Sequence, residues 1–430
     1  MKSVIFSTLL FFFSILQINA QDDFLANLLM DNSEHFETIL ANPEKFEVQI
    51  VYTQIDRDKD NVPSFKTHTY RLDENQYFYP ASTVKMPTAF MALEKLNGII
   101  ENEIQDSHVK SELDKFSWMT TKAVRYPQTI TDRDSTSKDG VPSIGHYIKK
   151  IFLVSDNDAQ NRLYEFCGQA YLNNKLREMG FDKTRIIHRL GPGGFPFNYY
   201  DNQYTNPILF KARPSWHEVR IPFEYFRNEV HSKVNYDLNL NNEIKGVAHQ
   251  KGDKIIDKPF DFSKKNFISI LDLHDMLKAV IFPESLPEEK RFNLTESDYE
   301  WLYRAMSQFP NEGLTLKYDK PDNYCKFFIY GDKPEDFEIP KHIRIFNKVG
   351  WAYGYLTDVA YIVDFEKNIE FFVTATIHVN ENQTYNDGVY EYEEIGLPFF
   401  ANLGRVLYDF EDKRERKFKP DLSKFKVEYW

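Results

Sequence analysis

The sequence of 430 residues has few cysteines and no excess of basic charge, and both features exclude classes of protein. Its two cysteines, Cys167 and Cys325, are too few for a disulfide framework or a thiolate zinc site, and their spacing leaves open whether they pair with each other. The net charge is −12, with 53 basic against 65 acidic residues, which argues against a nucleic-acid partner because phosphate binding needs a basic face. Hydrophobic residues make up 42% of the chain, as is typical of a well-packed globular protein.

Long apolar runs are absent after the first twenty residues. Lys2 precedes a mostly apolar stretch, Val4 to Leu16, and the small residue Ala20 follows it. A positive residue, a short apolar core and a small residue before the cleavage point are typical of a secretory signal. A run of about 13 apolar residues is too short to span a bilayer. We therefore predict a signal peptide over residues 1–20, a periplasmic or secreted location and no stable membrane insertion.

The periodicity of the apolar residues predicts an α/β protein whose sheet is built from both ends of the chain. Two β-rich segments, 46–55 and 65–72, flank a polar turn and predict a hairpin. Three further strands are expected near the C-terminus, at 343–349, 357–364 and 369–379. Helices are predicted at 23–42 with a break, 82–96, 143–153, 156–167, 268–281, 296–307 and 391–410.

Residues 191–265 are irregular, aromatic and rich in turn-forming residues, and we interpret them as an insertion. Its rings would either form a lid that grips substrate or pack as a satellite cluster on the surface. At the other end of the chain, residues 411–430 are expected to form a solvated C-terminal tail, because their basic run is interleaved with an acid.

The first segment with candidate chemistry is Ala81-Ser82-Thr83-Val84-Lys85, where a predicted helix begins. Residues three apart on a helix lie one turn above each other, so Ser82 and Lys85 face the same way. A serine hydroxyl needs a base to become a nucleophile, and a lysine can be that base when burial lowers its pKa. Taken alone, the pattern also fits a helix N-cap serine followed by a solvated lysine.

Two later segments carry further candidate residues. Ser155-Asp156-Asn157 opens another predicted helix, and alone it is typical of an N-cap. Lys348-Val349-Gly350 ends a predicted strand. A glycine at this position permits close approach of a ligand, and a lysine can hold a carboxylate.

In this order the three segments resemble the Ser-x-x-Lys, Ser-Asp-Asn and Lys-x-Gly motifs of the class A β-lactamase-like serine hydrolases, in the penicillin-recognising β-lactamase and transpeptidase superfamily. The resemblance covers most of residues 23–190 and 265–410. It implies a catalytic domain over 21–410, with an antiparallel sheet flanked by N- and C-terminal helices and an all-helical subdomain at about 97–300.

The resemblance also implies roles for individual residues. Ser82 would be the acylated nucleophile, Lys85 its base, and Ser155 the group that carries a proton to the leaving nitrogen. The backbone N–H groups of Ser82 and Trp351 would form an oxyanion hole, whose donors commonly contribute about 3–4 kcal/mol of barrier lowering. The implied substrate-binding residues are Asn157, Lys348, Gly350 and Trp351. The resemblance implies no cofactor and no metal, and its substrate is a small-molecule β-lactam or a cell-wall peptide.

Two departures from the family pattern concern binding and turnover. Val349 stands where the family has threonine or serine, so a hydroxyl for the substrate carboxylate is missing. Leu190 or Gly191 stands where class A enzymes have the glutamate that activates the deacylating water. His188 is a candidate substitute base, with a solvent-exposed loop histidine as the alternative interpretation.

The sequence therefore predicts an exported serine hydrolase that hydrolyses a β-lactam or a related amide through an acyl-enzyme on Ser82. Three alternatives stay open. One is a D,D-carboxypeptidase or esterase that acts on cell-wall peptides, and another is a penicillin-binding sensor that is acylated without turnover. The third is a chain that has lost its activity and serves as a structural partner.

Overall fold

A computed structural model of the chain describes residues 24–124, 129–191, 201–214, 222–232, 236–312, 318 and 320–429. The predicted signal peptide over residues 1–20 lies outside these ranges, as do positions 192–200 and 215–221 of the insertion. Within the described ranges, no helix combines the length and the apolar character that a bilayer crossing needs.

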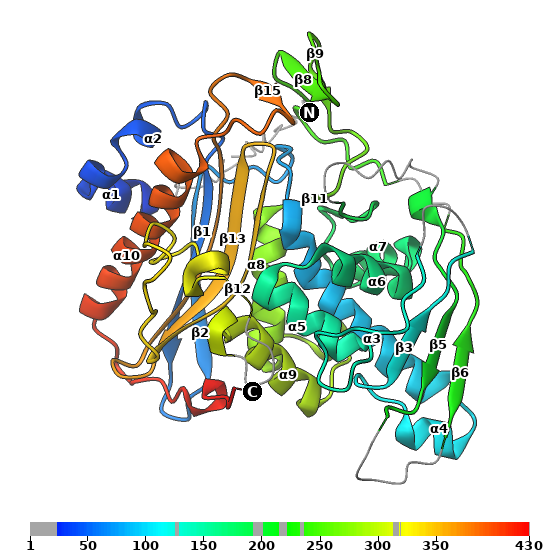
Figure 1. Ribbon diagram of the computed structural model, residues 1–430. Coiled ribbons are helices and arrows are strands. Elements are labelled where there is room, and N and C mark those ends of the chain that lie inside the picture. The colour runs from blue at the N-terminus through cyan, green and yellow to red at the C-terminus, as the bar shows by residue number, and fades with distance from the viewer. Residues whose placement is uncertain are drawn as a thin grey trace, which may run out of the picture.

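The central element is a five-stranded antiparallel sheet in the order β12-β13-β14-β1-β2 (Figure 1). Its strands are β1 (Gln49–Arg57), β2 (Pro63–Tyr70), β12 (Ile343–Ala352), β13 (Tyr355–Asp364) and β14 (Ile369–His378). Ile50 of β1 pairs with Ala375 of β14, so the two ends of the chain meet inside one sheet, which confirms the predicted construction.

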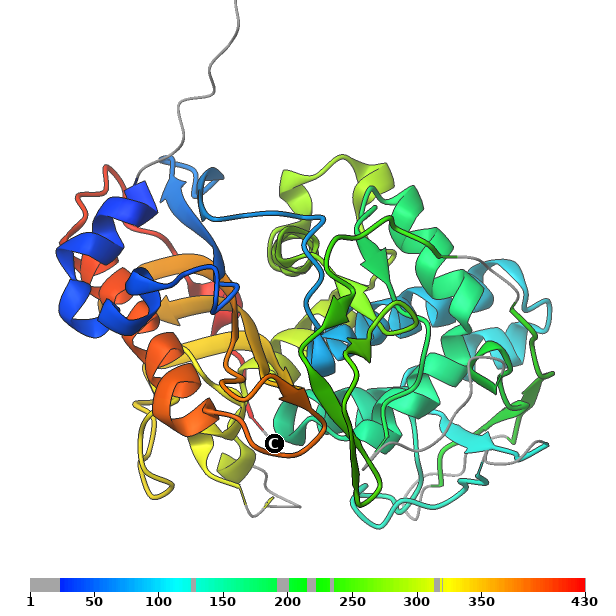
Figure 2. The same ribbon diagram turned by 90° about the horizontal axis from the view of Figure 1, so that it is seen from above.

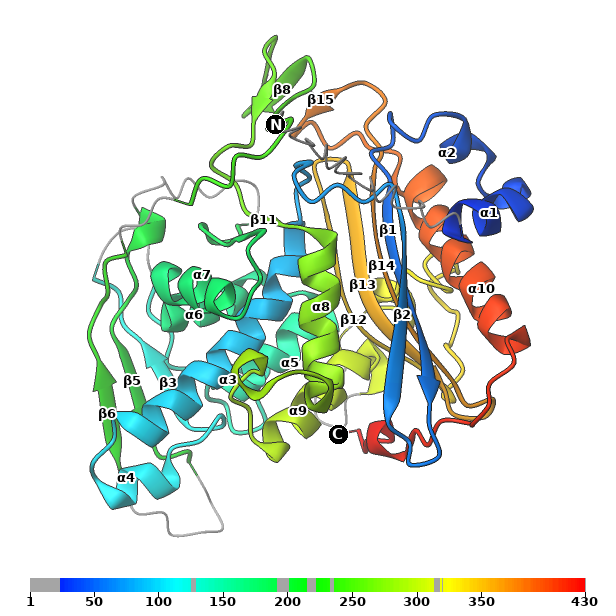
Figure 3. The same cartoon turned by 180° about the vertical axis from the view of Figure 1, so that it is seen from behind.

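Helices cover both faces of this sheet (Figures 2 and 3). On the outer face lie α1 (Phe24–Asp31), α2 (Glu37–Ala41) and α10 (Leu397–Lys413), and on the inner face lie α8 (Ile270–Ile281) and α9 (Glu296–Ser307). Every residue of β13 and β14 is buried as a result. A strand covered on both faces reads as a nearly continuous apolar and β-branched run, which is why these two were predictable.

The helical subdomain lies beside α8 and α9, and α3 (Lys85–Asn102) runs through its centre (Figure 1). Thirteen of the 18 residues of α3 are buried, as expected for a helix surrounded by other elements. The remaining α-helices are α4 (Ser107–Glu112), α5 (Ile144–Val154), α6 (Asn157–Cys167) and α7 (Gln169–Glu178). The sequence did not predict α7, because two of its four buried residues, Gln169 and Asn173, are polar.

The described parts of the insertion form short strands that join both halves of the molecule. Phe210 and Phe223 pack into the core of the helical subdomain, whereas Phe262 packs with Tyr79 and Tyr385 in a separate cluster. The insertion therefore contributes buried side chains to both of these hydrophobic clusters. Its short strands are β5 (Ile208–Lys211), β6 (Glu224–Arg227), β7 (Ile244–Lys245), β8 (Ala248–Lys251), β9 (Lys254–Ile256) and β10 (Phe260–Asp261). The described short strands outside the insertion are β3 (Trp118–Thr121), β4 (Thr184–Arg185), β11 (Phe267–Ile268) and β15 (Thr384–Tyr385).

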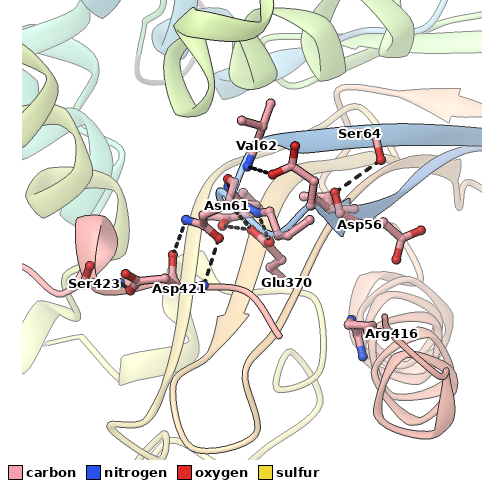
Figure 4. Close-up of polar contacts among 12 residues, drawn as sticks. Asp56, Asn61, Val62, Ser64, Glu370, Arg416, Asp421 and Ser423 are labelled. Atoms are coloured by element: carbon pink, nitrogen blue, oxygen red, sulfur yellow. Dashed lines mark hydrogen bonds and ion pairs between the residues drawn. The ribbon is translucent and has the colours of Figure 1, made fainter. Parts of the chain in front are cut away.

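The segment after α10 packs against the molecule, which corrects the predicted solvated tail. Arg414 Nε donates to the buried carboxylate of Glu411 at 2.8 Å, and Phe425 is buried in the core between the sheet and the helices. The side chain of Asn61, in the β1–β2 turn, bonds the backbone of Asp421 in both directions, at 3.1 and 3.0 Å (Figure 4). Burial of one aromatic ring and this pair of hydrogen bonds hold the segment to the sheet.

These layers give the fold class that the resemblance implied: an antiparallel sheet flanked by N- and C-terminal helices, with a helical subdomain inserted between strands β2 and β12. Cys167, in α6, and Cys325, which precedes β12, are both buried and both free. The two cysteines therefore form no disulfide with each other.

Candidate active site

Ser82 lies in a single 3₁₀ turn, Ala81–Val84, that leads directly into α3. The prediction that an α-helix begins at Ser82 was wrong by one turn, since the α-helix begins at Lys85. Ala81 has a φ of +46°, a left-handed conformation that is uncommon for a residue with a Cβ atom. This bend places the half-buried Ser82 at the wall of a cavity while Lys85 is fully buried beneath it.

The ammonium of Lys85 lies 2.9 Å from Ser82 Oγ. It also bonds to Ser155 Oγ at 3.0 Å, to Asn157 Oδ1 at 2.7 Å and to the backbone carbonyl oxygen of Ser155. None of these four oxygens belongs to a carboxylate. Burial, together with the positive charge of Lys348, lowers the pKa of Lys85 well below its usual value. The arrangement favours a neutral amine that can accept a proton.

The hydrogen-bond geometry fixes where that amine has its lone pair. The carbonyl oxygen of Ser155 and Oδ1 of Asn157 can only accept, so they take two N–H groups of Lys85. The hydroxyls of Ser82 and Ser155 can each donate or accept. In the neutral form, the free position on Lys85 Nζ therefore faces these two hydroxyls, and a proton can move between them through this nitrogen.

Ser155 lies between α5 and α6, in a left-handed conformation with a φ of +55°. The N-cap of α6 is Asp156, whose side chain accepts from the backbone N–H of Ala159 at 2.8 Å. Ser155 is thereby left free of capping, and its Oγ accepts from Lys348 Nζ at 2.9 Å. Burial lowers the pKa of Lys348 to about 8. Ser155 Oγ thus lies between two buried lysines.

Strand β12 passes close behind the nucleophile turn. A Cβ atom on Gly350 would lie 2.4 Å from the carbonyl oxygen of Pro80 and 2.9 Å from the backbone nitrogen of Ser82, so only glycine fits. Val349, the neighbouring residue, is buried in the hydrophobic cluster of the outer helices and lines no part of the cavity wall described. Trp351 is 41% exposed and does line the cavity. The position that lacks the family hydroxyl thus faces away from the site.

The cavity in front of Ser82 has a volume of about 590 Å³. Of the residues predicted for the site, Ser82, Asn157 and Trp351 line it, while Lys85, Ser155 and Lys348 connect to it through the hydrogen bonds of Ser82 and Asn157. The structure therefore brings all the predicted catalytic residues together. In the described ranges no group of three or more histidine, cysteine, aspartate or glutamate side chains is placed to hold a metal ion.

His188 also lines this cavity, which makes the interpretation as a solvent-exposed loop histidine wrong. Its Nδ1 bonds the carbonyl oxygen of Arg189 at 2.7 Å, and its Nε2 is buried with no hydrogen-bond partner among the described residues. Burial, reinforced by the charge of Lys265, lowers the pKa of His188 to about 3. The imidazole is therefore neutral near pH 7 and is a weak base.

Leu190 occupies the cavity wall where the family resemblance implied a glutamate. Its side chain is 7% exposed, and the amide of Asn161 holds its backbone on both sides, donating to Leu190 O at 2.6 Å and accepting from Leu190 N at 2.8 Å. The described residues that line the cavity include no aspartate and no glutamate. A carboxylate that could activate water is thus absent from the described wall.

Sequence reasoning missed a second group of wall residues: Lys264, Lys265, Tyr353 and Tyr390. They come from the end of the insertion and from the loops around β13 and β15, and no motif spacing connects them. The one available signal was the adjacent pair of lysines in an otherwise aromatic segment.

The antiparallel sheet, the helical subdomain and the serine–lysine pair at their junction define the superfamily of serine β-lactamases and penicillin-binding proteins. A profile of the β-lactamase enzyme family matches residues 33–410, and the chain belongs to this family.

Solved structures similar to this chain have low sequence identity to it. PBP-A is 13% identical, with 91% of this chain and 97% of that chain covered and a TM-score of 0.48. A β-lactamase from Sphaerobacter thermophilus is 11% identical, with 90% and 97% covered and a TM-score of 0.44. The chromosome-encoded β-lactamase of Vibrio parahaemolyticus is 11% identical, with 90% and 100% covered and a TM-score of 0.45. None of the curated proteins compared with the chain matches it.

Proposed function

We propose that this member of the β-lactamase enzyme family is an exported serine hydrolase that cleaves a β-lactam or a related amide through an acyl-enzyme on Ser82. The observation that carries the proposal is the buried Lys85 side chain, whose Nζ lies 2.9 Å from Ser82 Oγ and has no carboxylate partner among the described residues. Family membership supports hydrolase activity, and the class A type of mechanism is part of the proposal.

In the acylation step, Ser82 Oγ attacks the amide carbonyl carbon while its proton passes to the neutral amine of Lys85. Ser155 then gives its hydroxyl proton to the leaving nitrogen and is reprotonated by Lys85, 3.0 Å away. The C–N bond breaks, and an ester to Ser82 remains. The charge of Lys348, 2.9 Å from Ser155 Oγ, stabilises the partly deprotonated hydroxyl during this transfer.

The carbonyl oxygen becomes negative in the tetrahedral intermediate, and the backbone N–H groups of Ser82 and Trp351 would bind it. The absence of a side chain at Gly350 supports this assignment, because any Cβ atom there would displace the backbone nitrogen of Ser82. Asn157, held by Lys85 and exposed to the same cavity, would bind the amide on the acyl side of the substrate.

Deacylation separates this proposal from its alternatives. Leu190 stands in the wall where a carboxylate would activate water, and the pKa of His188, lowered to about 3, makes that imidazole a weak base. This observation favours a second candidate function, in which the protein acts as a penicillin-binding carboxypeptidase or sensor whose penicilloyl-enzyme hydrolyses slowly.

A time course of intact-mass spectra with benzylpenicillin tests the proposal and ranks the two candidates. Hydrolysis of the penicillin, with the protein back at its native mass by the earliest time points, supports a β-lactamase. An adduct that persists for many minutes supports the carboxypeptidase or sensor. If no adduct and no hydrolysis are found with any β-lactam or D-alanyl peptide, the proposed acyl-enzyme is contradicted.

A further inference from the structure

The cavity in front of Ser82 has an ammonium that nothing in the described protein neutralises. Lys265, at the end of the insertion, is half-buried and lines the cavity wall. Its Nζ has no hydrogen bond and no ion pair among the described residues, and lies 5.9 Å from the ring centroid of Phe260. Burial alone lowers the pKa of Lys265, since no carboxylate opposes it.

Three lysines that are buried more deeply than Lys265 have polar partners. Lys115 binds Asp298 at 2.9 Å, Lys245 binds Glu47 at 2.7 Å, and Lys326 donates to three oxygens. Burying a charge without a partner is unfavourable, so an unpaired ammonium at a cavity wall is the arrangement that an anionic ligand completes.

Lys264, the neighbouring residue, also lines the cavity and adds to its positive charge, whereas two other groups near Lys265 do not compete for such an anion. Arg189, which also lines the cavity, is already paired with the buried carboxylate of Glu165 at 2.8 Å. His188 is a neutral imidazole. No aspartate or glutamate occurs among the described lining residues, although the chain as a whole has a net charge of −12. The described cavity wall is therefore positively charged although the chain as a whole is negatively charged, which favours entry of an anion.

The backbone around Lys265 is held firmly against the loop that carries His188. Lys265 O accepts from Arg185 Nε at 3.0 Å. The side chain of Asn266 accepts from the backbone N–H groups of Ile187 and His188, at 2.8 and 3.1 Å, and donates to His188 O. The backbone that carries the Lys265 ammonium is therefore already fixed, so binding an anion requires little reordering of this segment.

The position of Lys265 indicates which end of a substrate it meets. Asn266, the residue after Lys265, bonds the backbone of His188, and His188 lies beside Leu190 on the wall that Asn157 also lines. Lys348 and Ser155, the groups proposed to act at the leaving nitrogen, belong to β12 and to the α5–α6 junction, and Lys265 contacts neither. Lys265 is accordingly on the acyl side of the cleaved bond.

We propose that Lys265 binds a carboxylate on the acyl side of the substrate, so that the preferred substrate is an acidic amide. This inference rests on the proposed function and adds a specificity-determining residue to it. The amide would carry one negative group on the side chain of its acyl portion, seated against Lys265 and the aromatic wall formed by Tyr79 and Tyr353, whose ring centroids are 5.1 Å apart.

Two penicillins that differ in one group test this proposal: benzylpenicillin and its α-carboxy derivative, which adds one carboxylate to the acyl side chain. Binding is measured by calorimetry in the Ser82→Ala background, where no ester can form, and acylation is measured by mass spectrometry with Ser82 intact. We expect the α-carboxy compound to bind at least ten-fold more tightly than benzylpenicillin. This preference should disappear in Lys265→Met, persist in Lys265→Arg and weaken as salt is raised.

Lys211→Met is the matched control, because Lys211 is also half-buried, with its Nζ 4.8 Å from the ring centroid of Trp118, but lies outside the cavity lining. It should leave the preference unchanged. Equal affinity for the two penicillins, no binding of either, or a preference that survives Lys265→Met would overturn the proposal. Failure of the proposed function has a different signature, since Ser82 would then stay unacylated in the protein with Lys265 intact, whatever the binding preference.

Discussion

Ser82 Oγ and Lys85 Nζ lie 2.9 Å apart, and the same lysine nitrogen lies 3.0 Å from Ser155 Oγ. One buried amine thus connects the proposed nucleophile to the hydroxyl that we propose as the proton donor to the leaving nitrogen. Lys348 approaches Ser155 Oγ from the sheet, 2.9 Å away. Three segments that are far apart in the sequence meet here because α3, the α5–α6 junction and β12 converge at the boundary between the sheet and the helical subdomain.

Replacing Lys85 by methionine should abolish most acylation while leaving the fold intact. Methionine fills a similar volume but cannot accept the proton of Ser82, and loss of a positioned base commonly lowers rates by about 10²- to 10⁴-fold. The second-order rate constant for acylation by benzylpenicillin measures the effect. Lys95→Met is the control, because Lys95 is on the same helix and bonds to the carbonyl oxygen of Cys167, away from the cavity lining. Equal rate constants in Lys85→Met and Lys95→Met would refute the assigned base.

Adding a methyl group at Gly350 of β12 should displace the turn that carries Ser82 and so slow acylation. Its Cβ would lie 2.4 Å from Pro80 O and 2.9 Å from Ser82 N, so the nucleophile turn must move. We expect Gly350→Ala to lower the acylation rate constant at least ten-fold, since a displacement of about 1 Å can cost 10²-fold.

Gly98→Ala provides the matched control for that substitution. Gly98 lies in α3, and a methyl group added there would have no neighbouring heavy atom within 4 Å, so alanine should leave acylation unchanged. It should also raise the unfolding free energy by about 0.5–1 kcal/mol, because alanine favours helix more than glycine does. Acylation that is normal in both variants would contradict the close packing of β12 against the turn.

Introducing a carboxylate at Leu190 should speed deacylation. Leu190 lines the cavity and its backbone is held by Asn161, so a glutamate side chain there would reach the space in front of Ser82. We expect Leu190→Glu to raise the rate of adduct loss by at least ten-fold, which is less than the 10²- to 10⁴-fold typical of a well-positioned general base because the introduced side chain is not held in place by partners. Leu190→Gln has the same shape without the base and should not do so. If both variants lose the adduct at the wild-type rate, Leu190 is not the position of the missing acid.

Acidification should destabilise the protein through His274. This side chain is buried between the hydroxyls of Thr53 and Thr374, at 2.8 and 2.9 Å, and burial lowers its pKa from 6.5 to about 4. Below pH 6.5 His274 becomes protonated in the unfolded chain, whereas in the folded chain it stays neutral down to about pH 4. The contribution of neutral His274 to the free energy of unfolding is therefore fully present above pH 6.5. It falls by about 3 kcal/mol as the pH drops to 4.

Urea unfolding at pH 7 and at pH 4.5 measures this dependence. His274→Asn should be less stable than the wild type at pH 7, because a ring and its hydrogen bonds are lost, but its unfolding free energy should change less between the two pH values. An unchanged pH dependence in the variant would show that His274 is not responsible.

The sequence predicted the parts of the fold that depend on local pattern. The hairpin of β1 and β2 and the strands β13 and β14 follow from β-rich runs, and α5 and α6 from apolar spacing. It did not predict α7, whose buried Asn173 is held by side-chain bonds to Gln169 O and Ile186 O that no apolar pattern reveals. The packed C-terminal segment was also missed, because its anchor, Asn61, is 360 residues away from Asp421.

The residues of the candidate site likewise fall into those that the sequence predicted and those that it did not. Ser82, Lys85, Ser155 and Lys348 stand in short motifs, so their convergence could be expected from the sequence. The burial of His188 and the exposure of Lys265 to the cavity depend on how the insertion folds back over α6, for which the sequence has no spacing rule. The packing of Val349 against the cluster of the outer helices was likewise not predicted from the sequence.

The role of Ser82 is tested most directly by locating the covalent adduct with tandem mass spectrometry after brief treatment with benzylpenicillin and acid quenching. We expect one penicilloyl group per chain, on Ser82, and no adduct in Ser82→Ala. A penicilloyl group on a different residue, or an adduct that forms equally well in Ser82→Ala, would contradict that role.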